Sequence, residues 1–332
     1  MQRRSLAGIM ERTAAPFFSR VREDMLAVEA RMRSAPGETN PQIEFAINQL
    51  LSSGGKRIRP TLVLLVGGMF GATHRQLISL AAAIELLHTA TLVHDDLIDG
   101  SLIRRGNPTL NSQWPPAATV LTGDYAFAHA AHLAAETGHL PLMKLFARTL
   151  MTMVNGEITQ LFNIGTDDLV QDYSDRIYAK TASLFEAAAY GAAIIANCEA
   201  SIAKEMRSFG YEIGMAFQIV DDVLDFTGLQ EQVGKPLAND LRQGIITLPT
   251  IKFHLRNPSH SKIKTILAGE QLHPQDLETL ITEIRQSQAI CDAMNDAETF
   301  VRSAQSRLNP LPDCDERHHL DQLASYIMQR QY

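Results

Sequence analysis

Apolar residues recur every three or four positions along most of the chain, and alanine and leucine dominate the apolar stretches. The run "LISLAAAIELLHTATLVHDD" at 77–96 shows the pattern. Half-buried strands would instead show apolar and polar residues in alternation, with many β-branched and aromatic side chains, and such alternation is almost absent. The spacing therefore predicts an all-α fold.

Helix breakers divide the chain into segments that suit helices of roughly 12 to 25 residues. They stand at 34–41, 52–60, 67–73, 106–116, 136–141 and 228–240. None has the length or polarity of a linker between independent domains. We therefore expect one helical domain over 1–332, with a motif-bearing core at about 45–256 and less informative segments at 1–40 and 257–332.

The composition argues against binding to nucleic acid and against a membrane-spanning segment. The 332 residues are 45% hydrophobic and carry a formal net charge of −7, so no broad basic surface is available for nucleic acid. The longest apolar stretch, 77–93, is interrupted by Glu85 and His88 and falls short of a membrane-spanning helix. We expect neither a nucleic-acid partner nor a transmembrane segment.

The cysteines and the N-terminus bear on location. Cys198, Cys291 and Cys314 are far apart and lack the paired spacing of a metal site, as suits a reducing compartment. Glu11 and Glu23 follow the first arginines closely, which is unlike a signal peptide. The expected location is cytoplasmic.

Two short aspartate clusters share one pattern, "DDLID" at 95–99 and "DDVLD" at 221–225. On a helix, Asp95 and Asp99 would lie on one face, roughly 6 Å apart along the axis. Carboxylates this close repel one another, and oxygen ligands of this kind suit Mg²⁺. One such cluster is often only a solvated helix face, but both copies follow strongly apolar sequence. We therefore predict two helices that present carboxylates to a shared cavity.

Cations stand near the predicted helix ends. "GGKRIRP" at 54–60 places Lys56, Arg57 and Arg59 behind a glycine turn, as a phosphate-binding loop at a helix N-terminus would. Arginine suits bidentate phosphate contacts, and lysine acts as a point charge. Further cations at helix breaks are Arg104, Arg105, Lys180 and Lys235.

Five segments, taken in order, resemble the motifs of the trans-isoprenyl diphosphate synthases, the polyprenyl synthetase family. They are "GGKRIRP", "HDDLIDGSLIRRG", "AKTASLF", "MAFQIVDDVLDF" and "GKPLANDL", spread over 54–241. The resemblance implies an all-α bundle around a deep central cavity, usually a homodimer. It also implies Mg²⁺-dependent, head-to-tail condensation of isopentenyl diphosphate with an allylic diphosphate.

The resemblance assigns roles to individual residues. Asp95 and Asp99 would hold two Mg²⁺ ions and Asp221 a third, so that the site holds three ions. The supporting carboxylates would be Asp96, Asp222 and Asp225. The residues that match the allylic-substrate positions are Arg104, Lys180, Thr181, Gln218 and Lys235, and those that match the isopentenyl diphosphate site are Lys56, Arg59, His88 and Arg105. A lone helical histidine is usually structural, so the role of His88 depends on the motif match. The residues expected to act in catalysis are Asp95, Asp99, Asp221, Lys180 and Lys235.

Two departures from the family pattern concern the substrates. The family often has a lysine where "GIITLP" places Ile245, which removes one cation near the diphosphate. The C-terminus, "MQRQY", lacks the clustered basic tail of many short-chain members. The second departure favours a product longer than farnesyl.

The helix before the first aspartate cluster should line the path of the growing chain. Thr91 and Leu87 lie one and two turns before Asp95 on the same side. In the family, a bulky aromatic about five residues before the motif stops growth early, and that position here is Ala90. No aromatic residue stands between Leu77 and Asp95, so we predict a C30 to C50 product. A floor formed by Phe127 or Phe146 would instead give geranylgeranyl diphosphate, C20.

Two other functions remain open at this point. A non-catalytic regulatory subunit of a heteromeric synthase shares the fold, but such subunits typically lose aspartates, and this chain keeps all six. A terpene cyclase also uses an aspartate-rich motif, but the basic "GGKRIRP" loop would have no role there. The prenyl elongating enzyme is the main hypothesis.

Overall fold

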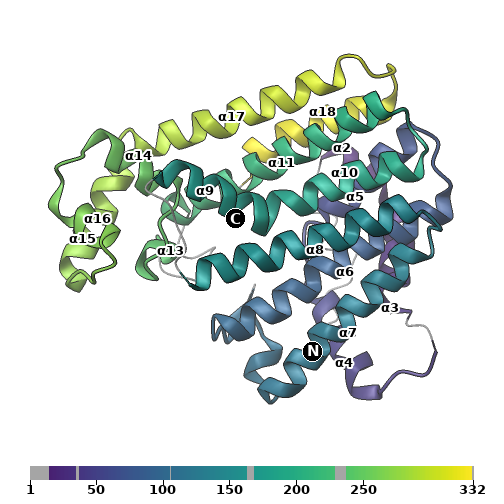
Figure 1. Ribbon diagram of the computed structural model, residues 1–332, viewed down its shortest axis with the longest axis horizontal. Helices are drawn as coiled ribbons and strands as arrows, with labels where there is room; N and C mark the ends of the chain where they lie inside the picture. The colour runs from purple at the N-terminus through teal and green to yellow at the C-terminus, as the bar shows by residue number, and fades with distance from the viewer. Residues whose placement is uncertain (1–14, 35–36, 105, 163–167, 229–236, 331–332) are drawn as a thin grey trace. The chain divides into compact units, whose positions relative to one another are not determined.

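The computed structural model describes residues 15–34, 37–104, 106–162, 168–228 and 237–330. In these ranges the secondary structure is helical (Figure 1) except for a short hairpin, in which β1 (Ile103–Arg104) pairs antiparallel with β2 (Asn107–Pro108). The predicted all-α class is confirmed. The hairpin was not predicted, because strands of two residues leave no periodic pattern.

Contacts between Cα atoms divide the chain into two compact units, each built from several segments. The first comprises 1–150, 184–210 and 307–323, and the second comprises 151–183, 211–306 and 324–332. The expected single-domain organisation stays a prediction. The division falls within several helices, most evenly within α8 (Leu140–Leu161), α11 (Ala200–Thr227) and α18 (Asp315–Met328).

The first unit is organised around α6 (His74–Ile98), which packs against α3, α5 and α7. Its other elements are α2 (Pro16–Arg20), α3 (Arg22–Arg33), α4 (Pro41–Ser52), α5 (Ile58–Met69), η1 (Leu110–Ser112), α7 (Pro116–Ala135) and most of α10 (Ser183–Ile195). Among described helices, α6 alone has the length and apolar composition of a membrane span, and 78% of its apolar window is buried inside the protein. Burial on this scale is typical of the core helix of a bundle.

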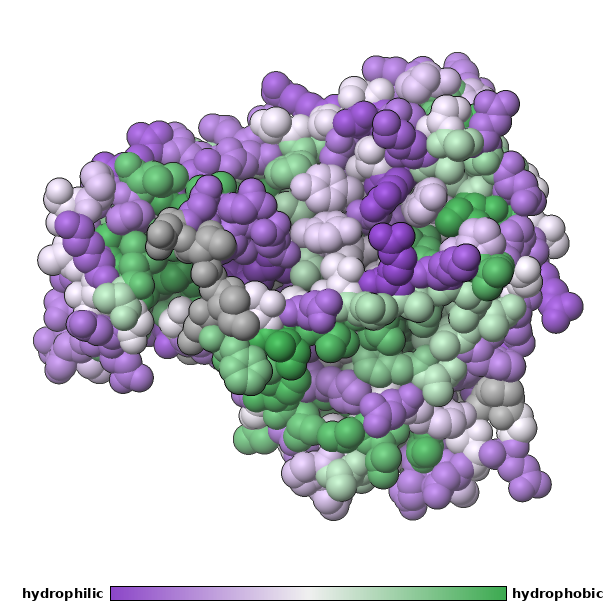
Figure 2. Space-filling model, in the orientation of Figure 1, coloured by the Kyte–Doolittle hydropathy of each residue, from purple (hydrophilic) through white to green (hydrophobic). Residues whose placement is uncertain are grey.

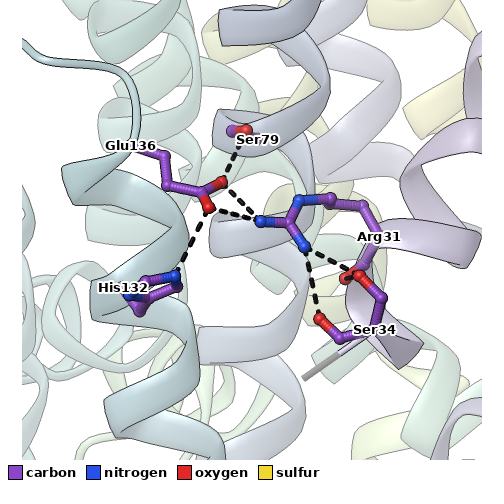
Figure 3. Close-up of polar contacts among 5 residues, drawn as sticks. All are labelled: Arg31, Ser34, Ser79, His132 and Glu136. Atoms are coloured by element: carbon purple, nitrogen blue, oxygen red, sulfur yellow. Dashed lines mark hydrogen bonds and ion pairs between the residues drawn. The ribbon is translucent and has the colours of Figure 1, made fainter. Parts of the chain in front are cut away.

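An ion pair links three helices of the first unit (Figure 3). Arg31 on α3 donates to both carboxylate oxygens of Glu136, at 2.5 and 2.6 Å, and also to the hydroxyl of Ser34. Ser79 on α6 donates to the same carboxylate, and His132 on α7 lies 3.3 Å from it. Burial raises the pKa of Glu136, but the hydrogen bonds and charge of Arg31 outweigh it and leave that pKa below its usual value.

The second unit has its own apolar core, formed by residues such as Phe226, Leu241, Phe253, Ile263 and Ile284. Its elements, besides parts of the long helices, are α9 (Leu169–Ile177), η2 (Tyr178–Ala182), α13 (Asn239–Arg242), α14 (Leu248–Arg256), α15 (Ser261–Leu267), α16 (Pro274–Gln286) and most of α17 (Ala289–Leu308). Proline opens α14 and α16 in the first turn, where its missing N–H costs no hydrogen bond.

Candidate active site

The first aspartate cluster lies at the C-terminal end of α6. Asp95 and Asp96 belong to the last turn, and Asp99 follows the helix with its N–H bonded to the carbonyl of Asp95 at 2.8 Å. Asp96 is buried, Asp95 is half-buried, and Asp99 is exposed. Because Asp99 keeps helical backbone angles, the predicted one-turn spacing of Asp95 and Asp99 is present.

The buried member of this cluster has a cationic partner nearby in the sequence. The Nε of Arg104 donates to Oδ1 of Asp96 at 2.8 Å. Arg104 lies in β1, the first strand of the hairpin that follows α6, so the ion pair spans only 8 positions. The supporting role of Asp96 and the contact of Arg104 with the allylic substrate both stay predictions.

His94 precedes this cluster and fits against α7 where Gly123 leaves room. A Cβ at Gly123 would lie 2.2 Å from Nε2 of His94, a separation that real Cβ atoms essentially never show. The ring lies 3.2 Å from the carbonyl oxygen of Val120 and 5.2 Å from the ring of Phe127. The close approach of α6 and α7 thus depends on a glycine directly beside the aspartates.

The basic loop 54–57 runs into the N-terminus of α5, where the sequence places a phosphate-binding loop. Arg57 does not face solvent there. Its guanidinium is 11% exposed and donates to Glu29 at 3.2 Å and to Glu85 at 2.9 Å. Arg57 also adopts φ of +49°, a left-handed conformation that is uncommon outside glycine. The buried pairs hold this strained turn and leave Lys56 exposed.

Two further residues predicted for the isopentenyl diphosphate site, Arg59 and His88, lie in the same unit. The guanidinium of Arg59 stacks over the ring of Phe185, 4.5 Å from its centroid. His88 lies on α6 and is half-buried. Arg105 lies outside the described residues.

The second aspartate cluster lies near the C-terminal end of α11, and its first two carboxylates have different surroundings. The side chain of Asp221 is 32% exposed. Asp222 is buried and accepts hydrogen bonds from the Tyr173 hydroxyl at 2.8 Å and from the Gln218 amide at 2.7 Å. Burial raises the pKa of Asp222 to about 7, with the charges of Asp240 and Asp221 adding to the effect and both hydrogen bonds opposing it.

Asp225 has a third kind of environment. Its carboxylate accepts from the backbone N–H of Asn239 at 3.1 Å and of Asp240 at 3.2 Å, and its carbonyl accepts from the N–H of Ala238 at 2.8 Å. It therefore fixes the start of α13 to α11. Lys235 belongs to 229–236, outside the described residues, so its predicted role stays a prediction.

Lys180 and Thr181 belong to η2, one π-helical turn between α9 and α10. Such turns are rare and are frequently found at functional sites. The Thr181 hydroxyl donates to Oε1 of Gln218 at 2.6 Å, and Nζ of Lys180 lies 3.0 Å from Oε1 of Glu157 on α8. Gly156 lets α8 approach, because a Cβ there would lie 2.4 Å from Cβ of Ala179.

Asp221 is paired with a residue from the C-terminal end of the chain. Nη2 of Arg330 donates to Oδ1 of Asp221 at 2.6 Å, across 109 positions of sequence. Its guanidinium also lies over the ring of Phe217, 3.7 Å from the centroid. Sequence reasoning missed Arg330, Tyr173 and Glu157, because each acts through a contact between distant segments.

The predicted chain-length residues occupy α6 as expected. Ala90 and Leu87 are fully buried, and Thr91 is half-buried with its hydroxyl bonded to the carbonyl of His88. The first unit also has a cavity of about 260 Å³ near Ile47, Tyr125 and His129. None of the predicted site residues lines that cavity. The first aspartate cluster belongs to the first unit and the second cluster to the second unit, and a cavity shared by both stays a prediction.

The carboxylates suit a hard divalent cation whose coordination shell is completed by the substrate. Within the described ranges, no three His, Cys, Asp or Glu side chains are grouped as a ready-made metal site. Mg²⁺ is usually bound by one or two carboxylates, several waters and substrate phosphates. Asp95, Asp99 and Asp221 are accessible enough to serve as such partial ligands.

Comparison with known proteins identifies the family. A model described as polyprenyl synthetase matches residues 40–284. Solanesyl diphosphate synthase 2, chloroplastic, of Arabidopsis thaliana is 37% identical over 323 residues, covering 94% of this chain and 76% of the relative. Heptaprenyl diphosphate synthase component 2 of Geobacillus stearothermophilus is 36% identical, covering 95% and 98%.

Solved structures agree with the sequence matches. The crystal structure of a decaprenyl diphosphate synthase from Rhodobacter capsulatus superposes with a TM-score of 0.86 at 33% identity, covering 95% of this chain and 98% of that one. The matched region contains both aspartate clusters, the basic loop and the π-helical turn. The chain therefore belongs to the polyprenyl synthetase family of prenyl transferases.

Proposed function

We propose that this protein condenses isopentenyl diphosphate head-to-tail with an allylic diphosphate and releases an all-trans polyprenyl diphosphate. The observation that carries the proposal is the arrangement within each aspartate cluster. Asp96 and Asp222 are buried and bonded to protein partners, whereas Asp99 is exposed and Asp95 and Asp221 are partly so. This is the arrangement that a metal completed by substrate requires.

Asp95, Asp99 and Asp221 would hold Mg²⁺, three ions in all, and Asp96, Asp222 and Asp225 would fix the helices that carry them. When bound, Mg²⁺ would stabilise the negative charge that grows on the departing diphosphate. Lys180 would add a positive charge from a position that Glu157 fixes at 3.0 Å. Thr181 and Gln218, hydrogen-bonded to each other, would orient the allylic diphosphate beside it.

The basic loop would bind the second substrate. Lys56 and Arg59 would hold the diphosphate of isopentenyl diphosphate, with His88 and Arg105 completing the set. Arg57 would act indirectly, because its pairs with Glu29 and Glu85 fix the loop. Separate sets of cations for the two diphosphates would keep the allylic group and the attacking double bond in a fixed order.

The chemistry needs no protein nucleophile. Cleavage of the carbon–oxygen bond leaves an allylic carbocation and a diphosphate, and the double bond of isopentenyl diphosphate then attacks the cation. The departing diphosphate would accept the proton lost at the end. Buried apolar residues such as Leu87 and Ala90 would exclude the water that would otherwise react with the cation.

The product is proposed to lie between C30 and C50. The relatives named above make solanesyl, heptaprenyl and decaprenyl diphosphate according to their names. The small, fully buried Ala90 agrees with an open path along α6. Geranylgeranyl diphosphate, C20, is the shorter alternative.

The assembly is proposed to be a homodimer in the cytoplasm. Met151, Val154, Ile158 and Leu161 form a stripe on α8, each between 46% and 63% exposed. Figure 2 shows hydrophobic side chains gathered along this helix. A contiguous apolar stripe of this kind marks a protein interface. The Geobacillus relative is named as one component of its synthase, so a heteromer is the alternative.

The decisive experiment incubates the purified protein with Mg²⁺, labelled isopentenyl diphosphate and an allylic primer, and resolves the dephosphorylated products by chromatography. Products of C30 to C50 support the proposal. Activity only after a second protein is added would indicate a regulatory or heteromeric role. Consumption of the primer without incorporation of isopentenyl diphosphate would indicate a cyclase.

A substitution at Ala90 tests the proposed product length. Ala90→Phe should shorten the product to C15 or C20 while the first condensation continues. Ala81→Phe is the matched control, because Ala81 is equally buried on α6 but lies on the opposite side, nine residues away at about 100° each. Equal product lengths for Ala90→Phe and wild type would contradict an open path beside Ala90.

A further inference from the structure

The guanidinium of Arg330 lies directly on the second aspartate cluster. Arg330 follows α18 at the C-terminal end of the described chain, and its side chain is 8% exposed. Its Nη2 donates to Oδ1 of Asp221 at 2.6 Å. Both residues belong to the second unit, so this contact is internal to that unit.

The ring of Phe217 holds the guanidinium in place. Phe217 precedes Asp221 by four residues on α11, so ring and carboxylate lie on the same helix face. The guanidinium carbon is 3.7 Å from the ring centroid, within the range of a cation–π contact. Arg330 is therefore bound along the face of α11 that presents Asp221.

Two nitrogens of this guanidinium are buried without a hydrogen-bond partner among the described residues. They are Nε and Nη1. Burying N–H donors of a charged group unpaired is costly, and proteins normally satisfy them with an acceptor or use them at a functional site. An anion with several oxygens, such as a diphosphate, would satisfy both.

We propose that Arg330 is a positioning residue that couples divalent-cation binding at Asp221 to the arrival of a diphosphate. Without diphosphate, the guanidinium is hydrogen-bonded to Oδ1 of Asp221, and its positive charge disfavours binding of a metal ion to the same carboxylate. A diphosphate would draw Arg330 to its own oxygens through Nε and Nη1 and release Asp221 for the metal. This inference rests on the proposed role of Asp221 as a metal ligand.

The coupling must act in both directions. If diphosphate strengthens metal binding at Asp221, then metal must strengthen diphosphate binding by the same factor. The expected consequence is that the second aspartate cluster takes up its cation together with a diphosphate. A purely structural role, in which Arg330 only ties the chain end to α11, predicts no change in metal affinity when the charge is removed.

The test measures Mn²⁺ binding by electron paramagnetic resonance, without isoprenoid substrates and with or without inorganic pyrophosphate. The variants are Arg330→Gln, Arg330→Lys and Asp221→Asn. Arg317→Gln is the matched control, because Arg317 belongs to α18, the helix that Arg330 follows, but pairs with Asp313. Circular dichroism checks that each variant is folded.

Without pyrophosphate, Arg330→Gln should bind Mn²⁺ at this position roughly fivefold or more tightly than wild type, the lower range of typical coupling between sites. Pyrophosphate should strengthen Mn²⁺ binding more in wild type than in this variant. Arg330→Lys should bind Mn²⁺ as wild type does without pyrophosphate, since the charge is kept, but should respond less to pyrophosphate, because lysine lacks the Nε and Nη1 donors. Arg317→Gln should change nothing.

The outcomes separate this inference from the proposed function. If Asp221→Asn weakens Mn²⁺ binding but Arg330→Gln matches wild type with and without pyrophosphate, the role of Arg330 is wrong and Asp221 remains a ligand. If Asp221→Asn binds Mn²⁺ as wild type does, the proposed role of Asp221 fails, and the inference fails with it.

Discussion

The two aspartate clusters have the same sequence pattern but different surroundings. In the first, the buried Asp96 is paired with Arg104, 8 residues away in a hairpin. In the second, Asp222 is bonded to Tyr173 across 49 residues, and Asp221 to Arg330 across 109. The first cluster is thus assembled locally, whereas the second joins α9, α11, α13 and the C-terminal end of the chain. A pattern of five residues therefore predicts that both clusters present carboxylates, but it does not predict which residues each cluster contacts.

The largest effect should come from the proposed metal ligands themselves. Asp95→Ala and Asp221→Ala should each lower turnover by about a thousandfold or more, because each removes a charge that acts mainly in the transition state. Circular dichroism should remain helical for both. Near-normal turnover of either variant in saturating Mg²⁺ would show that its carboxylate is not a ligand.

A second test asks whether the π-helical turn, like the second aspartate cluster, contributes to binding of the allylic substrate. Gly156→Ala should displace Ala179, and with it Lys180 and Thr181, and raise the Michaelis constant for the allylic substrate roughly tenfold to a hundredfold. Gly68→Ala is the control, because its Cβ would meet Glu316 at an ordinary 3.6 Å. An unchanged constant in Gly156→Ala would separate the turn from the substrate site.

The two proposed substrate sites can be compared directly. Lys56→Ala should raise the Michaelis constant for isopentenyl diphosphate about tenfold and leave that of the allylic primer nearly unchanged, and Lys180→Ala should do the reverse, since each removes a charge from one diphosphate only. Separate Michaelis constants for both substrates give the answer. Equal effects on both would mean that the cations are assigned wrongly.

The buried carboxylates should differ in their contribution to stability. Asp222→Ala leaves the Tyr173 hydroxyl and the Gln218 amide without their acceptor in a buried site, and should lower the free energy of unfolding by about 2 kcal/mol. Asp96→Ala should cost about 1 kcal/mol or less, because Arg104 is 35% exposed and can be hydrated. Urea unfolding measures both values. A larger loss for Asp96→Ala would reverse the comparison.

The last comparison concerns pH. The pKa of Asp222 is raised from 3.8 to about 7 on folding, so between these values the folded protein holds a proton that the unfolded chain has lost. The contribution of this group is therefore fully present below about pH 4 and is lost as the pH rises through 7. Asp222→Asn cannot titrate, so in EDTA the stability of wild type relative to this variant should fall from pH 4 to 7. A constant difference would mean that Asp222 is ionised throughout.

The helices and their breaks were predictable because they depend on local pattern. The predicted break at 34–41 separates α3 from α4, and the predicted phosphate loop precedes α5. The position of Asp95 and Asp99 at the end of a buried helix was likewise predicted. These features follow from apolar spacing and from glycine and proline, which act over a few residues.

The partners of the site residues were not predictable in the same way. "MQRQY" reads as a tail without clustered charge, yet its arginine reaches Asp221. Arg57 reads as one of three phosphate-binding cations, yet two glutamates on other helices bury it. A charged side chain has no fixed partner until the helices pack, so spacing along the chain cannot distinguish a ligand from a support.

The π-helical turn at 178–182 carries a consequence for how this sequence can vary. A π turn holds about one residue more than an α turn, and one residue rotates everything beyond it by about 100°. Removing a residue here would turn Tyr178–Ala182 into ordinary helix and rotate α10 relative to α9. No substitution produces such a rotation. The orientation of Lys180 and Thr181 therefore depends on the number of residues in the turn as well as on their identity. Relatives that differ by a single insertion or deletion in this segment should differ in substrate binding, even if their motif residues are identical.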